Sequence, residues 1–266
     1  MNNASRILSG GQLLSGKKKE TLPNEPLVSI ITTVLNGEKY IEETILSVLN
    51  QSYKNIEYII VDGGSADTTI QIIRKYEDRI DYWNSEKDSG IYFGFNRGLK
   101  IFTGDLVGFV NSDDTLNKDA IRTLVNYYNL NPKIDFIFGS VKKHWAVLHG
   151  YKPWKIFFTW GFYTSHSTGF FITRLAAKKV GFYDTQYKYS SDYYYFYRMI
   201  VKQKLKGIAT KKNEIFGNFR RGGFSSKISF FDHFAETIKI RLNNGQNKFI
   251  VLFIFIIKYL KNLNKL

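Results

Sequence analysis

LVSIITTVLN, residues 27–36, is a run of aliphatic and β-branched residues that ends in a polar residue. Ile41, Ile45 and Val48 follow at the spacing of one helical face, and IEYIIV at residues 56–61 is a second apolar run. A short apolar strand, an amphipathic helix and another apolar strand are typical of a βαβ unit, whose two strands lie parallel. The segment therefore predicts an α/β fold built on a parallel sheet.

The alternation of strands and helices continues through the first half of the chain. Apolar runs predict two further strands, at Ile80–Asn84 and Leu106–Val110. Helical spacing predicts three further helices, at residues 68–76, 92–102 and 121–128. Strands that alternate with helices imply a doubly wound, mostly parallel central sheet flanked by helices.

Boundaries can be placed where this pattern begins and ends. Residues 1–25 precede it and are expected to form an N-terminal extension. Residues 26–225 form one domain, whose alternation fades near residue 140 into an aromatic and basic stretch, so we divide it into residues 26–140 and 141–225. Residues 226–266 are expected to form a C-terminal helical extension that is both basic and apolar.

The composition limits where the protein acts and what it binds. The 266 residues include no cysteine, so neither a disulfide nor a thiolate metal site can form, which favours a reducing compartment such as the cytoplasm. Met1–Pro26 lacks the continuous apolar core of a secretory signal. The formal net charge of +15 predicts an acidic counterpart, which can be nucleic acid, an anionic membrane surface or a phosphate-rich small molecule.

Phe249–Ile257 is an unbroken apolar run, FIVLFIFII, between Lys248 and Lys258. A helix needs about 20 apolar residues to span a bilayer, so this run is too short to cross. An apolar face with flanking lysines is typical of a helix that lies in the plane of an anionic membrane surface. We expect a peripheral protein on the inner face of the cell membrane; the alternative is a helix packed on the domain or on a partner chain.

Polar clusters follow all four predicted strands. They are Thr33 with Asn36, Asp62–Ser65, Ser85–Asp88 and Asn111–Asp114. Ligands of open α/β sheets bind at the carboxyl ends of the strands, so these clusters are candidate site residues. Adjacent carboxylates such as Asp113 and Asp114 repel each other unless a cation or a hydrogen-bond donor compensates them. Mg²⁺ or Mn²⁺ bridging to a diphosphate would do so; a solvated turn in which Asp114 caps the next helix is the alternative.

Other nucleotide-binding and hydrolytic sites find no support in the sequence. It contains no G-x-x-x-x-G-K-[ST] phosphate loop, no G-x-G-x-x-G after the first strand and no G-x-S-x-G nucleophile elbow. Its four histidines lack the spacing of metal ligands. Kinase, dinucleotide-binding, hydrolase and zinc-enzyme interpretations are therefore weak.

Four segments, taken in order, resemble the family 2 glycosyltransferases. They are PLVSIITTVLN at residues 26–36, DGGSAD at 62–67, SEKDSGIY at 85–92 and NSDD at 111–114. The similarity covers roughly residues 26–225 and is closest to bacterial polysaccharide-assembly enzymes. It implies an A-type nucleotide-diphospho-sugar transferase fold, with residues 26–140 binding the donor and residues 141–225 the acceptor.

The resemblance also assigns residues by position. It implies that the nucleotide-sugar donor is bound by Thr33, Leu35, Asp62, Asp88, Asn96, Arg97, Asn111, Ser112 and Asp113. Of these, Thr33 and Asp62 would hold the nucleoside, and Asp113 or Asp114 would be the ligand of Mg²⁺ or Mn²⁺. Softer similarities place His166 beside the acceptor, and Arg220 with Arg221 in a loop that closes over the diphosphate.

Asp192, within YSSDY at residues 189–193, matches the catalytic base of the family. It would take the proton of the acceptor hydroxyl while the oxygen attacks the anomeric carbon from the face opposite the diphosphate, which inverts the configuration. We therefore predict an inverting, metal-dependent hexosyltransferase that moves a sugar to a saccharide acceptor, expected to be lipid-linked, in surface or capsular polysaccharide biosynthesis. The sequence leaves homo-oligomerisation open.

Two positions depart from the family pattern. Asn111 stands where many relatives have the first aspartate of a D-x-D motif, and Phe93 stands where close relatives have an aspartate. These changes would alter sugar specificity or reduce activity, so a degenerate partner of an active transferase is one alternative. A non-catalytic nucleic-acid-binding protein is the other, motivated by the net charge. The strand-end aspartates would repel a phosphate backbone, and we expect no nucleic-acid partner.

Overall fold

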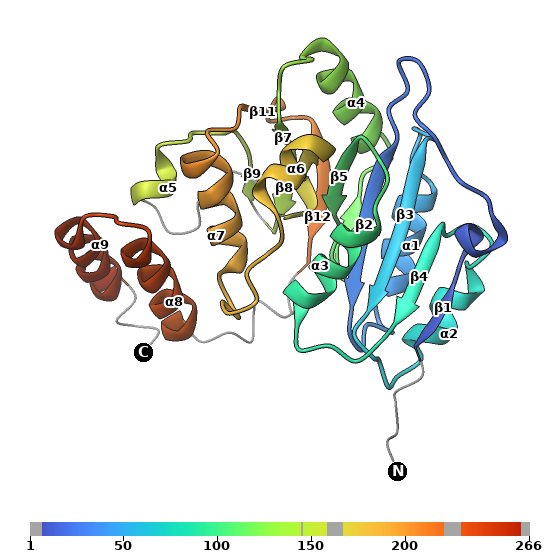
Figure 1. The fold of residues 1–266 in the computed structure, drawn as a ribbon, viewed down its shortest axis with the longest axis horizontal. Helices are drawn as coiled ribbons and strands as arrows, with labels where there is room; N and C mark the ends of the chain where they lie inside the picture. The colour runs from blue at the N-terminus through green and yellow to red at the C-terminus, as the bar shows by residue number, and fades with distance from the viewer. Residues whose placement is uncertain (1–6, 145, 159–166, 221–229, 262–266) are drawn as a thin grey trace.

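A computed structural model describes residues 7–144, 146–158, 167–220 and 230–261 (Figure 1). Its main sheet has eight strands in the order β1-β4-β3-β2-β5-β10-β7-β11. They are β1 (Leu8–Gly10), β2 (Val28–Val34), β3 (Ile56–Asp62), β4 (Tyr82–Ser85), β5 (Leu106–Phe109), β7 (Phe136–Phe138), β10 (Phe170–Thr173) and β11 (Gly207–Ala209). Neighbours β4-β3-β2-β5 are parallel, as is the pair β7 and β11, whereas β1 and β10 run antiparallel to their partners. The predicted doubly wound, mostly parallel sheet is confirmed.

Helices cover both faces of this sheet. The helices of the described residues are α1 (Ile41–Leu49), α2 (Thr69–Lys75), α3 (Ile91–Ile101), α4 (Ala120–Leu130), α5 (Lys155–Phe158), α6 (Arg174–Val180), α7 (Ser191–Tyr197), α8 (Phe230–Asn243) and α9 (Lys248–Lys261), with short turns η1 (Gln12–Ser15), η2 (Ser167–Gly169) and η3 (Arg198–Lys202). In β3, Tyr58 and Ile60 pack toward α1 and α2, whereas Ile59 and Val61 pack toward α3. Burial on both faces explains why these strands are mostly apolar and do not alternate between apolar and polar residues.

A second, smaller sheet follows residue 114. Its four strands lie in the order β6 (Thr115–Leu116), β12 (Ile215–Phe219), β8 (Ser140–Lys143) and β9 (Ala146–Leu148). The sequence after residue 140 showed only fading regularity, because strands of two to five residues are too short to display a period. Pairing of β12 with β6 brings Arg220, the residue after β12, next to the end of β5.

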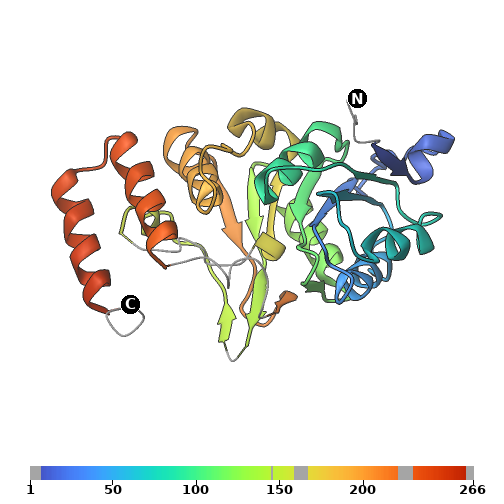
Figure 2. The same ribbon diagram turned by 90° about the horizontal axis from the view of Figure 1, so that it is seen from below.

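The C-terminal helices α8 and α9 form a hairpin beside α7, at the end of the molecule away from β1 (Figure 2). Phe234 of α8 stacks on Phe255 of α9 with ring centroids 4.9 Å apart. Val251 of α9 is buried, but many of its other apolar side chains are exposed. Within the described ranges, no helix is long and apolar enough to cross a membrane.

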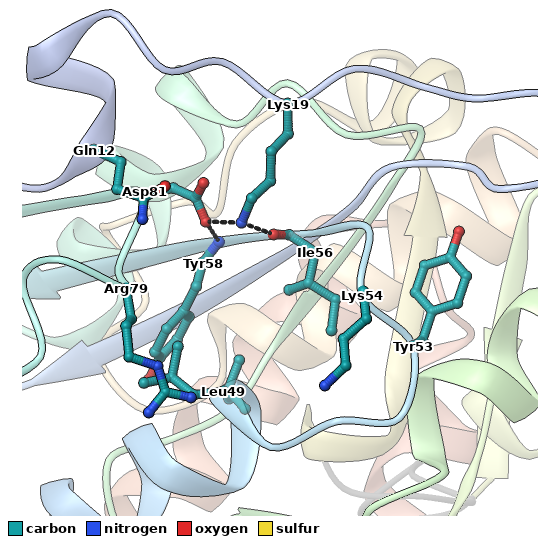
Figure 3. Close-up of a pocket in the computed structure, with 10 residues that line it drawn as sticks. Gln12, Lys19, Leu49, Tyr53, Lys54, Ile56, Tyr58, Arg79 and Asp81 are labelled. Atoms are coloured by element: carbon teal, nitrogen blue, oxygen red, sulfur yellow. Dashed lines mark hydrogen bonds and ion pairs between the residues drawn. The ribbon is translucent and has the colours of Figure 1, made fainter.

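An ion pair attaches the N-terminal segment to the sheet where β3 and β4 begin (Figure 3). Lys19 Nζ donates to the carboxylate of Asp81 at 2.8 Å and to the carbonyl of Ile56 at 2.6 Å. Asp81 is only 2% exposed and also accepts a hydrogen bond from Tyr58 N. Burial raises the pKa of Asp81, and Lys19 opposes that shift.

Removing Lys19 should therefore leave a buried carboxylate without its cation. We expect Lys19→Met to lower the free energy of unfolding by about 1–3 kcal/mol, less than for a fully enclosed pair because the lysine is partly exposed. Urea denaturation at neutral pH measures this change. Exposed Lys18→Met is the control and should change stability by less than about 0.5 kcal/mol. Equal effects of the two substitutions would contradict this role for the pair.

Candidate active site

Asp62, the last residue of β3, shapes the loop that follows the strand. Its carboxylate is fully buried and accepts hydrogen bonds from Gly64 N and Ser65 N, both at 2.9 Å, and from Ser85 Oγ at 2.6 Å. Ser65 Oγ donates to its second oxygen. Four donors from the protein thus occupy this carboxylate, so the contact with the nucleoside that the resemblance implies for Asp62 stays a prediction.

Asp88 lies next to Asp62, between two glycines. A methyl group at Gly63 would stand 3.2 Å from Asp88 Oδ1, and one at Gly94 would stand 3.7 Å from Oδ2. Arg97 donates to Asp88 Oδ2 at 2.9 Å and to the carbonyl of Asp62 at 2.7 Å. The guanidinium group therefore ties the ends of β3 and β4 together while the glycines leave space around the carboxylate.

Thr33 and Leu35 lie on the same edge of the sheet, at the end of β2. The hydroxyl of Thr33 is buried and has no hydrogen-bond partner, and its methyl group would be 2.9 Å from a Cβ at Gly94. Leu35 is 57% exposed. A buried hydroxyl without a partner is uncommon, and a bound ligand would supply one.

Asn96, on α3, binds the backbone of the loop before α7. Its side-chain amide donates to the carbonyl of Tyr183 and accepts from the N–H of the same residue, both at 2.8 Å. This pair of bonds fixes the loop before α7 against α3. In this structure the amide is therefore occupied by the protein.

Asp113 and Asp114 follow β5 in different environments. Asp114 is fully buried and accepts hydrogen bonds from Thr168 Oγ1 at 2.8 Å, Asn111 Nδ2 at 3.2 Å and Arg220 N at 3.2 Å. Burial, together with the charge of Asp113, raises the pKa of Asp114 to about 7. Asp113 is half-buried, and burial raises its pKa while Arg220 opposes the shift. Of the two carboxylates, that of Asp113 is the one more open to a ligand.

The residues around Asp113 offer hard oxygen atoms to a divalent cation. Asn111 Oδ1 is buried without a hydrogen-bond partner because the Nδ2 atom of the same amide faces Asp114 and Ser167. Within the described part of the chain, no group of three or more His, Asp or Glu residues could hold a metal ion by itself. Mg²⁺ is commonly held by one or two carboxylates plus substrate phosphates, so this donor set fits a cation that arrives with a diphosphate.

Arg220 places a positive charge beside this oxygen cluster. Its Nε donates to the carbonyl of Asp113 at 3.2 Å, and its Nη2 pairs with Glu43 of α1. The guanidinium also lies over the ring of Tyr40, 4.2 Å from the centroid. The predicted loop arginine is thus fixed next to the carboxylates, whereas Arg221 lies outside the described residues.

Asp192 lies in the first turn of α7 and accepts a hydrogen bond from the N–H of Tyr193 at 2.6 Å. It lies near Tyr92 of α3: burial raises the pKa of Tyr92, and the charge of Asp192 adds to that shift. Tyr92 in turn stacks on Tyr183 with centroids 5.7 Å apart. The candidate base therefore lies against the amino-terminal end of α3.

The structure thus arranges the predicted residues in three groups. Asn111, Asp113, Asp114 and Arg220 form one, and Ser112 joins it through a bond from Thr44 Oγ1 to its carbonyl at 3.0 Å. Asp62, Asp88 and Arg97 form the second, and Asp192 with Tyr92 forms the third. His166 lies outside the described residues.

Sequence reasoning missed several partners of these groups. They are Tyr40, Glu43 and the bond from Thr168 to Asp114. Ser85, which donates to Asp62, was among the predicted polar clusters and is the last residue of β4. Thr168 and Glu43 become neighbours of the site through long-range pairing that no local pattern reveals.

Comparison with known proteins identifies relatives in bacteria. An uncharacterised glycosyltransferase of Rickettsia typhi is 32% identical over 63% of this chain and 57% of its own length. An uncharacterised glycosyltransferase of Haemophilus influenzae and the putative teichuronic acid biosynthesis glycosyltransferase TuaG of Bacillus subtilis are each 40% identical over 39% of this chain. The matches cover 43% and 42% of those two relatives, so the chain spans about half the length of these proteins or less.

Two solved structures share the fold. Staphylococcus aureus TarS, residues 1–349, in complex with UDP-GlcNAc has a TM-score of 0.62 at 18% identity, covering 86% of this chain and 70% of the other. The mannosyltransferase PcManGT of Pyrobaculum calidifontis, in complex with GDP-Man and Mn²⁺, has a TM-score of 0.61 at 16% identity, covering 86% of this chain and 69% of the other. At these identities the similarity is one of fold.

The family model described as "Glycosyl transferase family 2" matches residues 29–214, a range that contains all members of the three groups except Arg220. The chain belongs to glycosyl transferase family 2.

Proposed function

We propose that this chain transfers a sugar from a nucleotide-diphospho-sugar to a hydroxyl group of a saccharide acceptor, with inversion at the anomeric carbon. The observation that carries the proposal is the oxygen cluster at the end of β5, where half-buried Asp113 and the unpartnered Oδ1 of Asn111 lie beside Arg220. Family membership leaves the nucleic-acid-binding alternative without support.

In this proposal the donor diphosphate binds between Asp113 and Arg220. Mg²⁺ or Mn²⁺ on Asp113 and Asn111 would supply positive charge to the leaving diphosphate. Arg220 adds a fixed guanidinium group, whose planar array of donors suits phosphate oxygens. Thr33 and Asp88 would line the nucleoside side of the same edge, where Gly63 and Gly94 leave room.

Asp192 is proposed as the general base. Its carboxylate would accept the proton of the acceptor hydroxyl as that oxygen attacks the anomeric carbon. The attack comes from the face opposite the leaving diphosphate, so the base and the metal group must lie on opposite sides of the sugar. Asp192 belongs to α7, beyond the donor half, which agrees with that requirement.

The relatives support the class of substrate. One is named for teichuronic acid biosynthesis, and the fold neighbours were solved with UDP-GlcNAc and with GDP-Man and Mn²⁺. We therefore propose surface polysaccharide assembly, with a lipid-linked acceptor, as the setting. Asn111 and exposed Phe93 replace the acidic residues expected at their positions, and we propose that they set donor specificity.

The proposal is tested by turnover of nucleotide sugars. With UDP-GlcNAc, UDP-glucose and GDP-mannose offered in turn, we expect Mn²⁺-dependent release of the nucleoside diphosphate. Asp113→Ala and Asp192→Ala should each lower kcat by about 10²–10⁴-fold, because one loses the cation and the other the base. Exposed Asp119→Ala is the control and should keep full activity. Unchanged turnover in both site variants would exclude the assigned mechanism, and nucleotide binding without turnover would favour the degenerate-partner alternative.

The raised pKa of Asp114 predicts a pH-dependent stability of the metal-free protein. Because the folded state binds this proton more tightly than the unfolded chain, Asp114 stabilises the fold at low pH, and the contribution is lost as pH rises from about 4 to about 7. The stability of the wild type relative to Asp114→Asn should therefore fall over that interval by up to a few kcal/mol, at about 1.4 kcal/mol per unit of pKa difference. Chemical denaturation at several pH values measures the difference, and a constant difference would refute the assignment.

Helix α9 supports a peripheral membrane location as part of the proposal. Phe249, Leu252 and Phe253 are 70%, 54% and 63% exposed, and Leu260 is 58% exposed. At 14 residues the helix is about 21 Å long, shorter than a bilayer core of about 30 Å. Such a helix can lie in the plane of the interface with lysines at its ends.

Binding to lipid vesicles tests this location. We expect the wild type to sediment with phosphatidylcholine vesicles that contain phosphatidylglycerol, more weakly at high salt and less with phosphatidylcholine alone. Phe253→Glu should reduce partitioning at least about tenfold, because it removes the transfer free energy of one phenylalanine and adds a negative charge. Leu130→Glu, at an 81% exposed site on α4, is the matched control. Dimerisation through α9 without vesicle binding would favour a partner chain instead.

A further inference from the structure

Helix α8 holds the segment that leads into α7. The carboxylate of Glu236 accepts three backbone hydrogen bonds, from Lys188 N at 2.8 Å, Tyr189 N at 2.7 Å and Ser190 N at 2.9 Å. Hydrogen bonds to an ionised acceptor are roughly twice as strong as neutral ones. One side chain of α8 therefore fixes three consecutive residues of the segment, and the last of them directly precedes α7.

Further contacts from α8 lie on both sides of Asp192. Before it, Ser190 is fully buried and its Oγ donates to the carbonyl of His233 at 3.1 Å. After it, the guanidinium of Arg241, only 1% exposed, lies 5.2 Å from the centroid of the Tyr193 ring. Helix α8 thus contacts Ser190, two residues before the candidate base, and Tyr193, directly after it.

The placement of α7 depends on such contacts because the helix is short. It has seven residues, Ser191–Tyr197, before the chain continues as the π-helical turn η3. A helix this short gains little stability from its own hydrogen bonds, since nucleation is costly. Tertiary contacts at its first turn therefore help to place Asp192, together with the buried side chains of Tyr195 and Phe196.

We propose that Glu236 is a positioning residue for the reaction: it holds the start of α7 so that the carboxylate of Asp192 meets the acceptor hydroxyl. The inference rests on the proposed function, in which Asp192 is the base. A misplacement of about 1 Å in a reacting group can cost about 10²-fold in rate. The C-terminal hairpin is accordingly required for turnover as well as for attachment to a surface.

The test compares Glu236→Gln, Glu236→Asp and the control Asp232→Asn, an exposed acidic residue on the same helix. The readout is Mn²⁺-dependent hydrolysis of the nucleotide sugar that the wild type turns over, with Asp192→Ala measured alongside. Glu236→Gln should lower kcat at least about tenfold while the donor KM and the Kd of the nucleoside diphosphate stay within about twofold. Glu236→Asp, which keeps the charge, should have a kcat between those of Glu236→Gln and the wild type. Asp232→Asn should match the wild type.

A second measurement does not depend on activity. Amide hydrogen exchange at residues 188–190 should accelerate in Glu236→Gln, because these N–H groups lose their charged acceptor, and should remain slow in Asp232→Asn. An unchanged kcat in Glu236→Gln would overturn the inference, as would an equal loss of nucleotide binding. If the wild type is active but Asp192→Ala keeps its full rate, the assignment of the base fails, and the positioning role fails with it.

Discussion

One buried carboxylate, that of Asp114, connects the elements that make the site. Its oxygens accept from Thr168, which precedes β10, and from the N–H of Arg220, which follows β12, while its carbonyl accepts from Thr44 of α1. A carboxylate without access to water is costly unless donors surround it. The two sheets and α1 must therefore meet at this point, and their meeting brings Asp113, Asn111 and Arg220 together.

The same requirement separates residues that organise the site from residues that are open to substrate. Hydrogen bonds within the protein satisfy the side chains of Asp114, Asp62 and Asn96. The carboxylate of Asp113 and the hydroxyl of Thr33 can still bind a ligand. Both arginines of the site are bound by the protein: Arg97 binds the ends of β3 and β4, and Arg220 binds the carbonyl of Asp113 and the carboxylate of Glu43. The protein thus satisfies the polar atoms that organise the site, while the carboxylate of Asp113 and the hydroxyl of Thr33 remain for a ligand.

The fold was largely predictable because its information is local. The apolar run at Val28–Val34 and the spacing of Ile41, Ile45 and Val48 encode a strand and a helix within a few residues, and the carboxyl edge follows from the parallel order. The small sheet was not predictable from periodicity, since β6 has only two residues. The engagement of Asp62 by Ser85 depends on two strands meeting, which sequence order alone does not report.

Helix α8 makes contacts on two sides, with α7 and with α9. Toward α7 it presents Glu236 and the buried Arg241, and toward α9 it presents Phe234, which stacks on Phe255. Buried polar side chains on one face need fixed partners, and α7 with the segment before it supplies them. Among the helices that carry a candidate site residue, α7 lies nearest to α9, with α8 between them (Figure 2). The exposed face of α9 is the one proposed to rest on lipid. A lipid-linked acceptor would then approach the protein from the side on which the proposed base is held.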